Sequence, residues 1–292
     1  MLGLTALALI WGTQYLIIRV GQESLPPLLT VALRYAILGV IAQVLVVVCR
    51  ARPPRGTWPA RLAFGALQAL GMGLLYWAEG HVVSSVAAIV IMTEPLLVAV
   101  LAPLWIPGER PSARVVVALV CGFVGVALLI AHRPPESDAG ALVTVATLAV
   151  GLSAVVGALA RVLCKDVVSK VPPVVILRDS GWIVTALAIA GSLAFERGRP
   201  MVFGTGAILA FAYLGVVASA AASGIYLVLL QRYRVTSLSY LQFVTALVAV
   251  ATGVLLGREH LGAAGVAGVA VVVAGLAVLV ARPALGQHAR DT

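Results

Sequence analysis

The chain of 292 residues is strongly apolar: 62% of its residues are hydrophobic and 11% are charged, whereas soluble domains carry roughly 45–50% apolar and about 25% charged residues. The mean hydropathy of +1.09 excludes an ordinary soluble domain, because such a domain needs more polar residues to cover its surface. The formal net charge of +9 does not indicate a nucleic-acid-binding stripe, because the basic residues stand singly or in small groups between apolar runs. We therefore expect a polytopic membrane protein.

Ten apolar runs, each near the roughly 20 residues that one membrane-spanning helix needs, follow one another along the chain. The runs are continuous and rich in small residues, which favours helices over the short alternating strands of a membrane β-barrel. The links between them are short. The predicted helices cover residues 2–20, 28–48, 60–79, 83–104, 113–132, 140–162, 174–195, 205–230, 236–256 and 262–281.

The Lys and Arg residues are distributed unevenly between the two ends of these predicted helices. If the chain starts in the cytoplasm, most of them fall in cytoplasmic links, among them Arg61 and Arg161. By the positive-inside rule, this bias places both termini in the cytoplasm.

Three sequence landmarks of the first half recur in the second half at nearly constant spacing. An odd number of spans in each unit would invert the second copy relative to the first. We therefore predict an all-α polytopic membrane protein of ten transmembrane helices, as two inverted five-helix repeats at residues 1–133 and 139–283, with a short cytoplasmic tail at 284–292. The landmarks are Pro26-Pro27 and Pro172-Pro173, Leu33-Arg34 and Leu177-Arg178, and Gly108-Glu109 and Gly257-Arg258-Glu259.

A series of short motifs follows the first five predicted helices in order: Trp11-Gly12, Leu33-Arg34-Tyr35, Ser84-Ser85-Val86-Ala87-Ala88, Glu94-Pro95-Leu96, Gly108-Glu109-Arg110-Pro111, and the glycines Gly122 and Gly125. Their order and spacing resemble the EamA-type transporters of the drug/metabolite transporter superfamily, and the resemblance covers essentially the whole chain. It implies a ten-span secondary transporter of amino acids, nucleotide-like compounds or other small metabolites, often an exporter. The second half departs from the pattern, with Thr245 where the first half has Pro95 and Ser153 where it has Trp11.

Arg34 lies inside the second predicted helix, where an arginine costs about 2.5–3.5 kcal/mol on insertion scales. Its guanidinium either offers bidentate hydrogen bonds to a substrate carboxylate or phosphate, or extends to the interface or to helix ends in a structural role. Arg178 is its counterpart in the second half, and the neighbouring Asp179 can neutralise it locally.

Glu94 is the deepest acidic residue, in the middle of the fourth predicted helix. A carboxyl group there either carries a proton or pairs with a cation, for which Arg34 is a candidate. We expect Glu94 to be a candidate for proton coupling as well as for substrate binding. Pro95 lacks a backbone donor and predicts a kink beside it.

Aromatic and amide side chains in several predicted helices can line a cavity near the membrane midplane. Trp11 can share a helix face with Gln14 or with Tyr15. The alternative place for such aromatic residues is the belt at the membrane interface. The candidate substrate-binding residues are Trp11, Gln14, Tyr15, Arg34, Gln68, Tyr76, Glu94, Tyr226, Tyr240 and Gln242.

The sequence lacks a phosphate-binding loop, an HExxH motif and a GxSxG motif, and its three cysteines show no metal or disulfide spacing. We therefore expect no enzyme activity, no cofactor and no metal site. The predicted function is secondary active transport by alternating access across the inner membrane, most simply export of amino acids or related small polar metabolites. The alternative is a flippase for a lipid-linked or phospholipid substrate. Expected partners are a small-molecule substrate and membrane lipid, but no nucleic acid, and a homodimer remains open.

Overall fold

The apolar runs fold into helices in the computed structural model of the chain. It describes residues 2–82, 84–91, 93–106, 112–114, 116–118, 120–121, 124–125, 139–233, 235, 238, 241–256 and 263–280. Every regular element within these ranges is a helix, as predicted. Five helical stretches are long and apolar enough to cross a membrane: Gly3–Gln22, Pro27–Val48, Gly140–Lys165, Pro173–Phe195 and Thr205–Arg232.

The described helices of the first half are α1 (Leu2–Gln22), α2 (Pro27–Val48), α3 (Trp58–Glu79), α4 (Ser84–Ile91) and α5 (Glu94–Trp105). The first three agree with their predicted ranges to within a few residues. The predicted helix at 83–104 is divided between α4 and α5. The division falls directly before Glu94-Pro95, because proline lacks the N–H of an intrahelical hydrogen bond and is tolerated in the first turn of a helix. The predicted helix at 113–132 lies largely outside the described residues.

The described helices of the second half are α7 (Ala139–Lys170), α8 (Pro173–Phe195), α9 (Thr205–Ala212), the π-helix η1 (Tyr213–Ala221), α10 (Ala222–Arg232), α12 (Leu241–Leu255) and α13 (Ala263–Val280). The helices α9, η1 and α10 follow one another without a break. The predicted end at residue 162 is wrong, because α7 continues to Lys170. Arg161, which the charge distribution assigned to a link, therefore lies inside a helix.

The two Pro-Pro pairs open α2 and α8. Pro27 and Pro173 each occupy the first turn, where the missing N–H would have no intrahelical partner in any case. The repeated landmark therefore marks the same position in two helices of the two halves.

Helices α2 and α8 pack against each other more extensively than any other pair among the described helices. Two glycines allow this close approach: a Cβ atom on Gly181 would lie 2.7 Å from the Cα of Gly39. At one end of this contact the buried carboxylate of Glu196 accepts hydrogen bonds from the first backbone amides of α2, those of Leu28 (2.8 Å) and Leu29 (3.2 Å). A carboxylate at this position satisfies amides that have no partner within the helix.

A buried ion pair joins α3 to α8. The Arg61 guanidinium donates to the Asp179 carboxylate, which also accepts from Nε of Arg178 at 2.8 Å. Arg61 was expected in a link, but it lies in the first turn of α3 and its side chain is 7% exposed. The two halves of the chain are thus joined by glycine packing, by a helix cap and by an ion pair.

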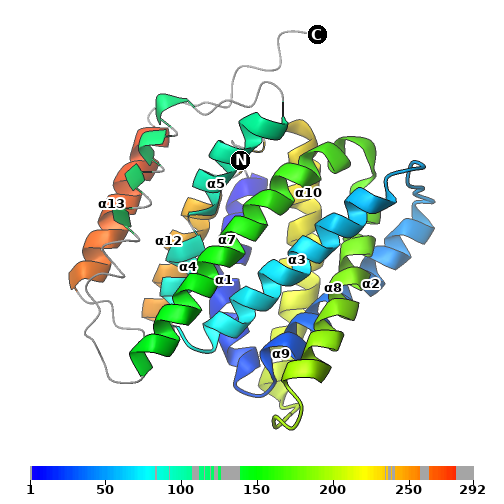
Figure 1. Ribbon diagram of the computed structural model, residues 1–292, viewed down its shortest axis with the longest axis horizontal. Helices are drawn as coiled ribbons and strands as arrows, with labels where there is room; N and C mark the ends of the chain where they lie inside the picture. The colour runs from blue at the N-terminus through cyan, green and yellow to red at the C-terminus, as the bar shows by residue number, and fades with distance from the viewer. Residues whose placement is uncertain are drawn as a thin grey trace.

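Figure 1 shows α2, α3 and α8 together on one side and α13 at the opposite edge, with α1 and α7 between them. Helices from both halves therefore alternate through the molecule.

Candidate functional site

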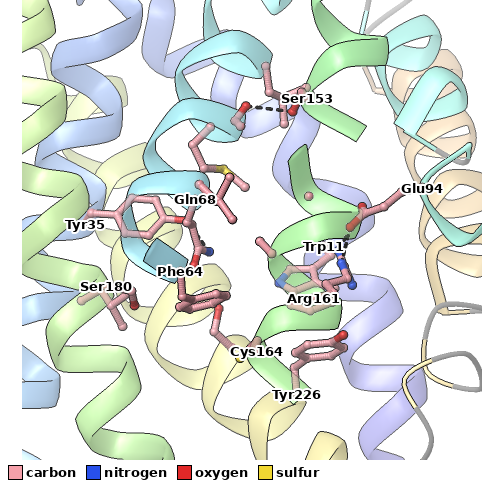
Figure 2. A pocket seen from close by; sticks show the side chains of 18 of the residues that line it. Trp11, Tyr35, Phe64, Gln68, Glu94, Ser153, Arg161, Cys164, Ser180 and Tyr226 are labelled. Atoms are coloured by element: carbon pink, nitrogen blue, oxygen red, sulfur yellow. Dashed lines mark hydrogen bonds and ion pairs between the residues drawn. The ribbon is translucent and has the colours of Figure 1, made fainter. Parts of the chain in front are cut away.

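A cavity of about 160 Å³ lies at the centre of the described helices. Figure 2 shows Tyr35 and Gln68 on one side of it and Glu94, Arg161 and Tyr226 on the other. Helices of both halves supply the walls, and the charged residues of the lining are Arg34, Glu94 and Arg161. The polar and aromatic residues that line it are Trp11, Gln14, Tyr15, Tyr35, Phe64, Gln68, Ser153, Cys164, Ser180, Ser223 and Tyr226.

Arg34 of α2 is 4% exposed and its guanidinium is held by three neutral oxygens. Its Nη1 donates to the hydroxyl of Tyr76 (2.8 Å), its Nη2 to the Oε1 of Gln14 (3.0 Å) and its Nε to the Oγ of Ser219 (2.6 Å). Across the described ranges, no carboxylate lies within salt-bridge distance of this guanidinium. The three oxygens fix the orientation of the guanidinium, and the buried carboxylate of Glu79 acts on its positive charge electrostatically.

Glu94 at the start of α5 pairs with Arg161 of α7. The Arg161 Nη2 donates to Oε2 at 3.1 Å, and its Nε donates to Oε1 in the second, shorter contact. Gly157, one turn before Arg161, makes room for the carboxylate, because a Cβ there would lie 2.9 Å from Oε1. The predicted alternative in which Arg34 is the partner of Glu94 is wrong, since Glu94 pairs across the two halves with an arginine that the sequence reasoning had placed in a link.

A tilted pair of aromatic rings, Tyr226 and Trp11, lies beside Arg161, and Tyr226 contacts its guanidinium. The Cζ of Arg161 lies 5.3 Å from the centre of the Tyr226 ring, a cation–π distance, and the Tyr226 and Trp11 rings are 5.4 Å apart. The Nε1 of Trp11 donates to the carbonyl of Ala218 at 3.1 Å. This carbonyl belongs to the π-helix η1, and π-helical turns are frequent at functional sites because their widened hydrogen-bond pattern departs from that of the α-helix.

Hydrogen bonds between uncharged groups fix side chains elsewhere in the cavity wall. The amide of Gln68 donates to the Tyr35 hydroxyl at 3.1 Å, and the Ser153 hydroxyl donates to the carbonyl of Gly71 at 2.8 Å. Both bonds connect polar groups of neighbouring helices or turns in the cavity wall. They leave the lining side chains little rotational freedom.

Seven of the predicted substrate-binding residues line this one cavity: Trp11, Gln14, Tyr15, Arg34, Gln68, Glu94 and Tyr226. Tyr76 is buried behind Arg34 and contacts its guanidinium. Tyr240 lies outside the described residues, and of Gln242 only its place in α12 is described.

Sequence reasoning missed Arg161, Tyr35 and Ser219. Gly157 and Arg161 are four residues apart within the predicted helix 140–162 and therefore share a helix face, a signal that could have identified Arg161 as a residue of the site. For Ser219 there is no such signal, because a serine among alanines in an apolar helix is unremarkable in the sequence. The described residues contain no group of three or more His, Cys, Asp and Glu side chains that could hold a metal ion.

Comparison with known proteins shows which transporters this chain resembles. The family model described as the EamA-like transporter family matches residues 1–131. The predicted resemblance to the EamA-type transporters is confirmed. This EamA match includes Trp11, Arg34 and Glu94, and so covers the first-half side of the cavity.

Individual relatives extend the EamA-type similarity into the second half. YedA of Escherichia coli K12, described as an uncharacterized inner membrane transporter, is 27% identical over 263 residues, which cover 88% of this chain and 83% of YedA. YvbV of Bacillus subtilis, described as an uncharacterized transporter, is 28% identical over 193 residues, covering 65% of this chain and 59% of YvbV. A solved crystal structure at 22% identity covers 95% of each chain with a TM-score of 0.75, which shows a shared fold. The relatives support a membrane transporter.

Proposed function

We propose that this protein is a secondary transporter that binds a small polar metabolite, an amino acid or a related compound, in the central cavity and exports it by alternating access. The observation that carries the proposal is that helices of both halves line one cavity, and that a buried arginine in it has no carboxylate within salt-bridge distance among the described residues. An arginine guanidinium is suited to bidentate recognition of a carboxylate. Movement of one half against the other would expose such a site to either side of the membrane in turn.

The size of the cavity favours a small metabolite over the alternative lipid-linked or phospholipid substrate. Its volume of about 160 Å³ is smaller than the roughly 300–1,000 Å³ that drug-sized ligands occupy. A lipid headgroup with its attached chains would need a larger cavity.

The proposed architecture has ten spans in two inverted five-helix units, at residues 1–133 and 139–283, with both termini and the tail at 284–292 in the cytoplasm. The matched Pro-Pro openings of α2 and α8 support it, as does the alternation of helices from the two halves. The relative YedA is described as an inner membrane transporter, which supports the inner membrane as the location. No step of this proposal requires catalysis.

Glu94 is the proposed site of proton coupling. Arg161 donates to both oxygens of its carboxylate, and a proton on this carboxylate would remove the charge that holds the arginine across the two halves. Proton binding and the relative position of the halves would then be linked.

The test is uptake of labelled amino acids and 2-hydroxy acids into proteoliposomes, with and without an imposed proton gradient. We expect gradient-driven accumulation of one class by the native protein and gradient-independent equilibration by Glu94→Gln. The exposed Glu23→Gln is the matched control and should accumulate substrate like the native protein. Absence of movement of every compound by folded protein would refute transport of this class, and an unchanged gradient response of Glu94→Gln would refute its coupling role.

A further inference from the structure

The π-helix η1 is unusually long. Most π-helices are single turns inside α-helices, whereas η1 runs for nine residues from Tyr213 to Ala221. The hydrogen bonds of a π-helix join residues five positions apart, so Tyr213 and Ala218 lie one turn apart on the same face. At the roughly 100° per residue of an α-helix, the same two residues would be about 140° apart. The register of η1 therefore decides what these two residues can contact.

Helix α1 contacts both of these positions of η1. The Tyr213 hydroxyl donates to the carbonyl of Ile10 at 3.2 Å and lies 2.6 Å from Oγ1 of Thr13. One π-turn later, the carbonyl of Ala218 accepts a hydrogen bond from Nε1 of Trp11 at 3.1 Å. The three residues of α1 belong to a single turn of that helix. One turn of α1 thus fits the π register of η1, and an α-helical register would not keep both contacts.

The residue of η1 that follows Ala218 holds Arg34 of α2. Ser219 is buried, and its Oγ accepts a hydrogen bond from Nε of Arg34 at 2.6 Å. Gly215, four residues earlier, lets η1 approach α2 closely, because a Cβ atom there would lie 2.7 Å from the Cβ of Ile37. The register that turns the Ala218 carbonyl towards α1 therefore also turns the Ser219 hydroxyl towards α2.

The bond to Ser219 decides which N–H groups of Arg34 are left for a ligand. A guanidinium has five N–H donors, one on Nε and two on each terminal nitrogen. Ser219 accepts from Nε, while Tyr76 and Gln14 each accept from one terminal nitrogen, which leaves one N–H on Nη1 and one on Nη2 in the described structure. Two such N–H groups can form the bidentate contact of an arginine with a carboxylate. The Glu79 carboxylate acts on the guanidinium electrostatically and does not change this division of donors.

Resting on the proposed transport function, we propose that Ser219 is a positioning residue for the substrate carboxylate and that the contacts of η1 with α1 set its place. The Ser219 hydroxyl holds Nε of Arg34, so that the terminal nitrogens are presented to the carboxylate. Tyr213 is not among the residues that line the cavity. It acts on the substrate through the register of η1, and then through Ser219 and Arg34.

The first experiment compares two side chains of equal shape at position 219. Ser219→Thr keeps the hydroxyl, and Ser219→Val has the shape of threonine without it. The probes are three pairs of acid and amide: L-alanine and L-alaninamide, L-phenylalanine and L-phenylalaninamide, and L-lactate and L-lactamide. Binding is titrated as the shift of the melting temperature of the purified protein in detergent. We expect Ser219→Val to bind the acids about 3- to 10-fold more weakly than Ser219→Thr does, the range of one hydrogen bond, and to bind the amides equally.

The second experiment changes the contact between η1 and α1 from outside the cavity. Tyr213→Phe removes only the hydroxyl that contacts α1, and we expect it to weaken binding of the acids but not of the amides. The exposed Tyr233→Phe is the matched control and should bind every probe like the native protein. A readout without a ligand is modification of arginine by phenylglyoxal, followed by mass spectrometry. Ser219→Val and Tyr213→Phe should both increase the modified fraction of Arg34 relative to that of Arg61.

The outcomes separate this proposal from the proposed function. Equal binding of the acids by Ser219→Thr and Ser219→Val, or an equal loss for acids and amides, would overturn the positioning role of Ser219 and leave transport intact. Native binding of the acids by Tyr213→Phe would overturn the part of the η1 register.

Two controls keep the proposal testable if a protein does not fold or a probe does not bind. Melting without a probe shows whether each variant is folded, and Ser219→Ala, compared with the native protein, replaces the pair if the larger side chains prevent folding. Failure of every probe to bind the native protein or to move in proteoliposomes would refute the proposed function itself. Equal modification of Arg34 with and without the hydroxyl at position 219 would then still overturn the role of Ser219.

Discussion

Two buried arginines with nearly equal exposure, Arg61 at 6% and Arg34 at 4%, have opposite surroundings. Arg61 of α3 donates to the Asp179 carboxylate of α8 and lies outside the cavity, at the contact between the two halves. Arg34 of α2 lines the cavity and contacts a phenol, an amide and a hydroxyl. The two arginines are nearly equally buried, so burial does not tell a structural arginine from a binding one. The kind of group that each guanidinium contacts does.

This difference has an energetic basis. Removing one partner of a buried ion pair leaves the other charge uncompensated, which is strongly destabilising. Arg34 has no carboxylate within salt-bridge distance among the described residues, so its removal breaks three hydrogen bonds to neutral oxygens rather than an ion pair. Variants of the two sites should therefore differ in whether folding or binding is lost.

The largest effect on stability is expected for Asp179→Asn. This change leaves Arg61 buried without a carboxylate and should lower the free energy of unfolding by about 3–5 kcal/mol. Unfolding of the purified protein in detergent measures it. Adding Arg61→Met should recover part of the loss, because the pair is then replaced rather than broken, and an Asp179→Asn protein as stable as the native one would contradict the structural role.

For Arg34→Gln we expect loss of binding with little loss of stability. Hydrogen bonds to a charged group contribute about 1.5–3 kcal/mol, so a carboxylate substrate should bind roughly 10- to 100-fold more weakly. Competition for uptake and melting without ligand measure the two effects separately. The exposed Arg199→Gln is the matched control, and a protein that unfolds early while it binds normally would reverse the contrast between Arg34 and Arg61.

Gly181→Ala tests whether α2 and α8 must approach each other as closely as the structure shows. The new Cβ would meet the backbone of Gly39 at 2.7 Å, and overpacking of this kind costs about 1–3 kcal/mol. Gly151→Ala in α7 is the matched control, since a Cβ there meets no atom within 4 Å. Equal melting temperatures of the two variants would show that the helices separate easily at this point.

The smallest effect is expected for Glu196→Gln. The variant keeps an oxygen acceptor for the amides of Leu28 and Leu29 but loses the charge at the start of α2. An anion at a helix N-terminus contributes about 0.3–1 kcal/mol, so the melting temperature should fall slightly. The exposed Glu23→Gln should not change it, and an effect as large as that of Asp179→Asn would place the main connection between the halves here.

Several parts of the fold could be predicted because they depend on local composition. Apolar runs of sufficient length predicted α1, α2, α3 and α8 closely, and the Pro-Pro pairs correctly marked the starts of α2 and α8. The end of α7 could not be predicted in this way. Its last two turns carry charged residues, and one of them, Lys165, reaches the end of another helix, where its Nζ donates to the carbonyl of Leu230 at 2.5 Å.

The candidate site was predictable only as a set of unusual residues. Polar residues inside apolar runs identified Arg34, Glu94 and Gln68, and aromatic residues identified Trp11 and Tyr226, all of which line one cavity. Their partners were not predictable from spacing. Glu94 and Arg161 are separated by 67 positions, and only the rotation and crossing of α5 and α7 decide that they meet.

The sequence alone predicted a helical membrane protein that resembles the EamA-type transporters, because span length, hydropathy and short motifs are local properties. The tertiary structure alone decided which buried charges are compensated. The free energy of a charge in an apolar interior depends on atoms a few ångströms away, and in this molecule those atoms come from helices far apart in the chain. In the sequence, Arg61 and Arg34 are both single arginines in apolar helices. Only the folded structure shows that Arg61 lies at the contact between the two halves and that Arg34 lines the cavity.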